Sequence, residues 1–123
     1  MRYYRVKEPN ELKKLSEETL LNLLQDIENR KVTVTLDRAK SKEAIEDENG
    51  IYHFETSNKW KIGVFVDCGK FDYIQYISHG GAKIDFDKIC RYYPKVDQYA
   101  DKFRNKDLAK KVWGIEAKIF ADL

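Results

Sequence analysis

The chain has 123 residues, of which 42% are hydrophobic and 13% are aromatic, so it can bury a core without disulfides or a structural metal. Its 23 basic and 21 acidic residues leave a net charge of +2, which is too balanced to predict nucleic-acid binding by itself. The sequence has no apolar run long enough to cross a membrane, and its N-terminal residues have no signal-peptide pattern. We therefore expect one cytoplasmic domain over residues 1–123, without membrane contact.

The first predicted elements are a helix and a strand. Within Ser16–Arg30, four apolar residues recur at the spacing of one helix face: Leu20, Leu23, Leu24 and Ile27. Ser16 is the expected N-cap, and two acids follow it at the positive end of the helix. In Lys31–Asp37, apolar residues alternate with threonine, which predicts a half-buried strand. Arg38–Gly50 has no apolar period, so we expect an exposed loop that ends in an Asn-Gly turn.

Further strands and two helices follow. Alternating runs separated by short turns occupy Tyr52–Glu55, Trp60–Val66, Phe71–Ile77 and Ala82–Phe86. Short turns make neighbouring strands antiparallel. Apolar residues return to helical spacing after Pro94, and again in a last helix that includes Leu108, Val112, Trp113, Ile115 and Ile119. The pattern predicts an α+β fold, with a four- or five-stranded, mostly antiparallel sheet flanked by an N-terminal helix and C-terminal helices.

The sequence carries no recognisable motif for catalysis or metal binding. Its two histidines, His53 and His79, and its two cysteines, Cys68 and Cys90, lie in separate predicted elements. They lack the close spacing of a zinc site, and no glycine-rich phosphate loop is present. We therefore expect no enzyme activity, no catalytic residue, no metal and no cofactor. Both cysteines are predicted to be free, buried thiols.

Two carboxylates leave one enzymatic alternative open. Asp67 and Asp72 flank the turn between the third and fourth predicted strands, so both can lie at one end of the sheet. In that position they suit acid–base chemistry or Mg²⁺ binding. A solvated acidic patch, or carboxylates that cap turns, is the favoured interpretation, and an anchor for arginine or lysine on a partner is a third.

The charges are sorted into patches along the chain. Glu43–Glu48 carries four acids and no base, whereas Lys88–Lys111 carries eight basic and three acidic residues. The basic segment also holds aromatic residues, a combination that suits the stacking of nucleic-acid bases. A nucleic-acid-binding protein is therefore one alternative. Because no RNP-like or KH-like signature accompanies the segment, nucleic acid is the less favoured partner.

Dense charge and abundant tyrosine favour a protein-binding role. Tyr73 and Tyr76 are predicted to lie on opposite faces of the sheet, and either can serve as an aromatic anchor. The acidic patches suit the basic cleft of a nuclease. The residues predicted to bind a partner are Glu43, Glu46, Asp47, Glu48, Asp67, Asp72, Tyr73, Tyr76, Asp85 and Asp87. The sequence leaves the oligomeric state open.

One stretch resembles a group of known sequences. Trp60–Ile74, which reads WKIGVFVDCGKFDYI, is similar to the core of an uncharacterised family of small bacterial proteins. In that pattern a strand begins at Trp and ends in Asp-Cys, and Asp-Tyr follows shortly after. The matching residues here are Trp60, Phe65, Asp67, Cys68, Asp72 and Tyr73. The resemblance implies a hairpin.

In size, charge density and lack of catalytic motifs, the whole chain resembles the immunity proteins of contact-dependent and other polymorphic toxin systems. The resemblance implies a cytoplasmic α+β inhibitor that binds and neutralises one cognate bacterial toxin domain. Immunity proteins against nucleases are often acidic, whereas this chain has a pI near 8.4. Only its acidic patches therefore suit a basic toxin.

Overall fold

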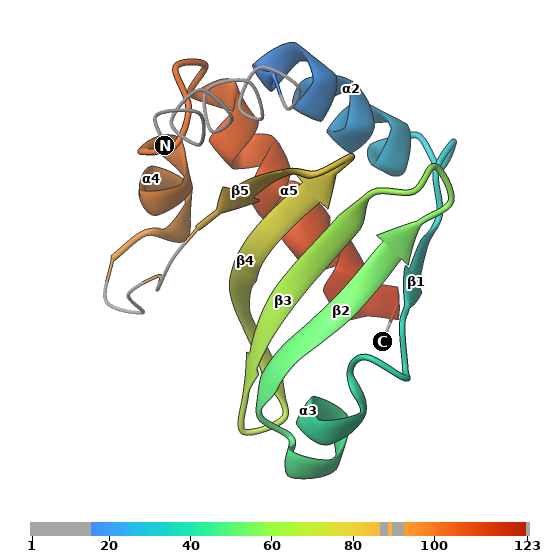
Figure 1. Cartoon of the computed structure of the whole chain (residues 1–123). Coiled ribbons are helices and arrows are strands. Elements are labelled where there is room, and N and C mark those ends of the chain that lie inside the picture. The colour runs from blue at the N-terminus through green and yellow to red at the C-terminus, as the bar shows by residue number, and fades with distance from the viewer. Residues whose placement is uncertain (1–15, 87–88, 90–92, 123) are drawn as a thin grey trace, which may run out of the picture.

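A computed structural model describes residues 16–86, 89 and 93–122 of the chain (Figure 1). In chain order the elements are α2 (Glu17–Glu28), β1 (Val34–Leu36), α3 (Lys42–Asp47), β2 (Gly50–Thr56), β3 (Lys61–Asp67), β4 (Lys70–His79), β5 (Ala82–Asp85), α4 (Lys95–Ala100) and α5 (Asp107–Asp122). The predicted α+β class is confirmed, because the chain forms a five-stranded antiparallel sheet. In the sequence, α2 precedes the strands of this sheet, and α4 and α5 follow them. None of the helices in these ranges is long and apolar enough to cross a membrane.

The five strands pair in the order of the sequence, from β1 at one edge to β5 at the other. Two of the connections are two-residue turns with left-handed backbone at both positions. Cys68 and Gly69 have φ of 53° and 75°, and Gly80 and Gly81 have φ of 58° and 89°. Turns of this kind match the right-handed twist of the strands they join, which explains the tight hairpins β3–β4 and β4–β5.

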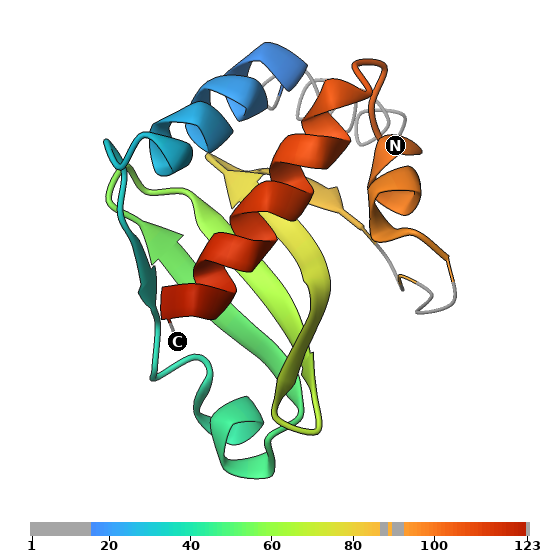
Figure 2. The ribbon, with the colours of Figure 1, turned by 180° about the vertical axis from the view of Figure 1, so that it is seen from behind.

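The core lies between the sheet and α5, which crosses one sheet face diagonally (Figure 2). The four apolar residues predicted for the first helix are all buried: Leu20, Leu23, Leu24 and Ile27. Its predicted N-cap is also confirmed, because the Ser16 side chain accepts a hydrogen bond from the Thr19 amide at 3.2 Å. The Glu17 carboxylate accepts from the amides of Arg104 and Asn105, at 2.7 and 3.0 Å, and joins α2 to the start of α5.

Two local predictions were wrong. The first strand is shorter than Lys31–Asp37, because only Val34–Leu36 pairs with β2. The segment Arg38–Gly50 is not simply a loop, because it contains the six-residue helix α3. That helix buries little more than one alanine, so its apolar spacing is too sparse to be visible in the sequence. Ser41 holds it in place: its hydroxyl accepts from the His53 amide of β2 at 2.8 Å.

Two bulges in β4 change which side chains share a face. The pairing with β3 shifts between Gly63 and Val64 and again between Phe65 and Val66, and each shift inserts one extra residue into β4. Tyr73 consequently lies opposite Phe65, and Tyr76 lies opposite Gly63, on the same face of β3. The prediction that the two tyrosines occupy opposite faces is therefore wrong. That prediction assumed that side chains alternate strictly between the two faces along the strand. The residue that the bulge inserts between Tyr73 and Tyr76 breaks this alternation.

A buried polar network joins α4 and α5 to the bulged strand. Glu116 of α5 is only 3% exposed. Its carboxylate accepts from the Tyr99 hydroxyl at 2.7 Å and from the Lys95 ammonium at 2.8 Å. The Tyr99 hydroxyl in turn accepts from the Ile74 amide at 2.8 Å, and Lys95 donates to the Asp72 carbonyl. Burial, and then the neighbouring carboxylate, raise the pKa of Tyr99, so the phenol stays protonated and able to donate.

Candidate protein-binding surface

Two acidic segments that lie far apart in the sequence meet at one end of the sheet. Helix α3 and the β3–β4 turn both lie at the lower end of the view in Figure 1. The Gly69 amide in that turn donates to the Glu48 carbonyl at 2.7 Å, which ties the turn to the end of α3. We call the resulting surface the acidic end, formed by Glu43, Glu46, Asp47, Glu48 and Asp67.

The acidic end is open to solvent. The four carboxylates of the α3 segment are exposed, and Asp67 is partly exposed. Within residues 42–48 and 67–70 the bases are Lys42 and Lys70, so acids outnumber bases there although the whole chain is slightly basic. Like charges held together on a surface create a local potential that a net charge does not reveal.

The β3–β4 turn also brings together the carboxylates considered for catalysis. Asp67, Cys68 and Asp72 line one shallow hollow of about 270 Å³. The Cys68 thiol lies 3.5 Å from an Asp67 carboxylate oxygen. Cys68 is exposed, so the prediction of a buried thiol is wrong: it occupies the first position of a two-residue turn. Cys90 lies outside the described residues.

The outer face of the sheet is the face turned away from α5. Side chains that pair across strands form rows on it, and the row nearest the acidic end is Ile51–Phe65–Tyr73. Ile51 and Phe65 are partly exposed, whereas Tyr73 is only 5% exposed. The Phe65 and Tyr73 rings lie 5.5 Å apart. An apolar strip therefore borders the acidic end, with Phe65 as its accessible aromatic residue.

The next row on the outer face is built around a glycine. Gly63 pairs with His53 on one side and with Tyr76 on the other, and the Tyr76 ring lies over the glycine. This position lets the Tyr76 hydroxyl share a hydrogen bond of 2.7 Å with His53 Nδ1. The Lys83 ammonium lies 4.7 Å from the centre of the Tyr76 ring. Glycine is thus required here for close approach rather than for an unusual backbone angle.

A Gly63→Ala variant is expected to lose about 1–3 kcal/mol of its free energy of unfolding, the usual cost of overpacking. An alanine Cβ at this position would overlap the Tyr76 ring and force it away from His53. Chemical denaturation measures the change. Gly114→Ala is the matched control: it lies in α5 without a close contact and should be neutral or stabilising. If Gly63→Ala costs as much in a Tyr76→Ser background, the ring contact is not the cause.

His53 gives the folded state a pH dependence. Burial, and then the charge of Lys40, lower the pKa of His53 from its ordinary value of 6.5. The unfolded chain therefore takes up this proton first as the pH falls, so the free energy of unfolding should decrease below about pH 6.5 until the folded-state pKa is passed. In denaturation experiments from about pH 7.5 to about pH 5, His53→Gln should show a flatter profile than the wild type. Parallel profiles would contradict this assignment.

The remaining predicted partner-binding residues lie elsewhere. Tyr76 and Asp85 pair across β4 and β5 on the outer face, and Asp85 forms a surface ion pair of 3.4 Å with Lys83. Burial raises the pKa of Tyr76. Asp87 lies outside the described residues. The structure thus brings Glu43–Glu48 and Asp67 together and places Asp72 in the same hollow as Asp67, whereas Asp85 lies at the end of the edge strand β5.

Of the basic segment Lys88–Lys111, residues 88 and 90–92 lie outside the described residues, and several bases of the remainder make internal contacts. Lys95 belongs to the buried network, Lys106 donates to the Ala100 carbonyl at 2.9 Å, and Lys111 pairs with Glu28 at 3.4 Å. Trp113, which had been predicted on the apolar stripe of the last helix, is instead 53% exposed. It lines a hollow of about 350 Å³ with Pro94 and Val96, a second exposed apolar patch.

Across residues 16–86, 89 and 93–122, no group of three or more His, Cys, Asp and Glu side chains is arranged to hold a metal ion. Comparisons with protein-family models, curated protein sequences and solved structures found no match to this chain. The geometry itself defines a class of protein: a small α+β domain that presents an exposed acidic end beside a partly apolar sheet face.

Proposed function

We propose that this chain is a protein-binding inhibitor, an immunity protein that neutralises a cognate bacterial toxin domain. The observation that carries the proposal is the acidic end, where α3 and the β3–β4 turn join two acidic segments on one exposed surface. Such a surface attracts a basic partner and accelerates the encounter with it. A nuclease domain fits this charge, because its active cleft has to attract the polyanionic phosphate backbone.

The apolar strip beside the acidic end supports the same proposal. Specific interfaces combine an apolar or aromatic centre with a charged rim, and here Ile51 and Phe65 border the carboxylates. One partner contributes about 800 Å² to a standard interface, roughly a tenth of the 8212 Å² accessible surface of this chain. An inhibitor of this kind acts by covering the active cleft, so it needs no catalytic group of its own.

The proposal predicts that a neighbouring gene encodes a toxin-like domain, and that domain is the partner to use in the test. Co-expression should yield a complex that survives purification, and the chain should restore growth to cells that produce the toxin domain. A toxin domain from an unrelated system serves as the control and should be neither bound nor neutralised. Failure to associate at micromolar concentration, together with failure to restore growth, would refute the proposal.

A further inference from the structure

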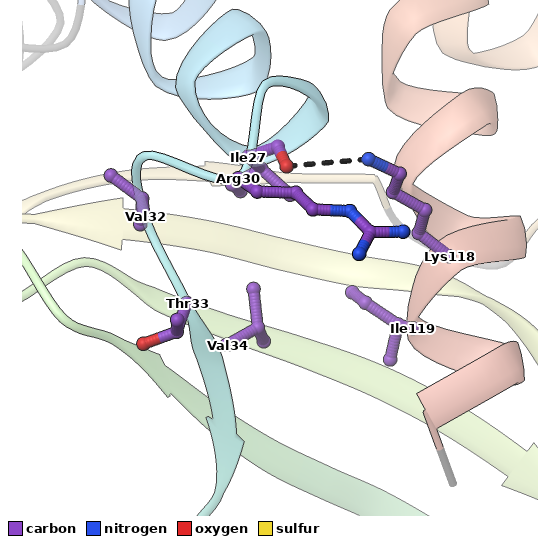
Figure 3. A pocket seen from close by; sticks show the side chains of 7 residues that line it. All are labelled: Ile27, Arg30, Val32, Thr33, Val34, Lys118 and Ile119. Carbon is purple, nitrogen blue, oxygen red and sulfur yellow. Dashed lines mark hydrogen bonds between the residues drawn. The ribbon is translucent and has the colours of Figure 1, made fainter.

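A cavity of about 580 Å³ lies between the end of α2, the edge strand β1 and the last turns of α5 (Figure 3). Ile27, Val32 and Ile119 are buried residues of its lining, and with Val34 they form an apolar wall. The volume falls within the range of about 300–1,000 Å³ that is typical of small-molecule sites. The cavity shares no residue with the acidic end.

Two cations belong to the lining of this cavity. The Lys118 ammonium donates to the Glu28 and Ile27 carbonyls at the end of α2, at 2.7 and 3.4 Å. Arg30 is exposed, and its guanidinium makes no ion pair with any residue that the structure describes. The nearby Glu28 carboxylate is already paired with Lys111 at 3.4 Å. Positive charge therefore lies beside the apolar wall of this cavity, and no carboxylate among the described residues pairs with Arg30, which favours an anionic occupant.

The backbone places Arg30 over the cavity. Arg30 follows the C-cap of α2 with a φ of 60°, and its amide donates to the Ile27 carbonyl at 3.1 Å. This left-handed conformation strains a side chain that has a Cβ, and helices usually use glycine at this point. Figure 3 shows the Arg30 side chain extending from the end of α2 across the opening toward α5. Arg30 therefore combines a strained backbone, a feature that clusters at functional sites, with a guanidinium that pairs with no carboxylate among the described residues.

We infer that this cavity binds a small organic anion with an apolar body, such as a medium-chain carboxylate. The anionic group pairs with the Arg30 guanidinium at the opening, and the apolar body packs against Val34 and Ile119. The inference does not depend on the proposed inhibitory function, because it concerns different residues and a different kind of ligand.

Titration of the whole chain with octanoate, below the concentration at which octanoate forms micelles, tests the inference. Calorimetry gives the affinity, and methyl NMR gives the location. Octanoate should bind at least about tenfold tighter than octylammonium, which has a similar body and the opposite charge. The methyl shifts should be largest at Ile27, Val34 and Ile119. Absence of saturable octanoate binding, or equal affinity for both probes, would overturn the inference.

Variants at Arg30 separate binding from folding. Arg30→Gly should weaken octanoate binding at least about fivefold without lowering the thermal midpoint, because glycine adopts the left-handed backbone without strain. Asparagine also tolerates the left-handed conformation, so Arg30→Asn is a second variant. It should show the same weaker octanoate binding and the same unchanged thermal midpoint. Lys31→Gln removes a neighbouring exposed cation outside the cavity lining and should leave the affinity unchanged. Unchanged affinity in Arg30→Gly and Arg30→Asn would also overturn the inference.

Discussion

A Glu116→Ala variant is expected to lose about 2–4 kcal/mol of its free energy of unfolding, the largest stability change we expect from a single polar substitution. The carboxylate is buried and accepts from both Tyr99 and Lys95, so its removal leaves a buried hydroxyl without an acceptor and a partly buried ammonium with the Asp72 carbonyl but no counter-charge. Part of the cost is relieved because Lys95 can turn toward solvent: its side chain is 27% exposed. Chemical denaturation measures the change.

The same network supplies graded controls. Glu116→Gln keeps an acceptor for the Tyr99 hydroxyl and should cost less than Glu116→Ala. Asp85→Asn removes a carboxylate from an ion pair whose side chains are about half exposed, and it should cost less than about 1 kcal/mol. Hydrogen exchange at the Ile74 amide, which donates to Tyr99, should accelerate in Glu116→Ala. If Glu116→Ala costs no more than Asp85→Asn, the network does not hold α5 to the sheet.

Local patterns in the sequence were sufficient for much of the fold. The spacing of apolar residues in α2 predicted its buried face, because a helix that packs on one side must repeat with its own period. The short separation between the runs Phe71–Ile77 and Ala82–Phe86 predicted a turn, and Gly80 and Gly81 adopt the left-handed angles that a tight turn needs. Helix α3 was missed, because its position depends on Ser41 binding the backbone of a strand twelve residues later in the chain.

The candidate surface was predictable only in part. Asp67 and Asp72 were expected at one end of the sheet because they flank one turn, and they do line the same hollow. Their meeting with the acidic segment of α3 depends on the contact between Gly69 and Glu48, which no local pattern encodes. The inserted residues of β4 likewise leave no clear mark in the sequence, so the shared face of Tyr73 and Tyr76 was not foreseen.

The acidic end makes a specific prediction about association with the toxin partner. Reversing two exposed charges of this surface, in a Glu46→Lys, Asp47→Lys variant, should slow association about 10- to 100-fold at low salt. Long-range attraction acts mainly on the encounter, so the dissociation rate should change much less. Stopped-flow or surface binding kinetics measure both rates. The difference between variant and wild type should shrink as added salt screens the charges.

A matched variant distinguishes this surface from a general effect of charge. Asp97→Lys, Asp101→Lys makes the same change in net charge, but both residues lie in or next to α4 rather than at the acidic end. It should associate at close to the wild-type rate, because attraction depends on where the charges lie. Trp113→Ser tests the exposed apolar patch beside α4. If Trp113→Ser weakens the complex while Glu46→Lys, Asp47→Lys leaves association unchanged, the partner binds on the α4–α5 side, and the acidic end is a solvated surface.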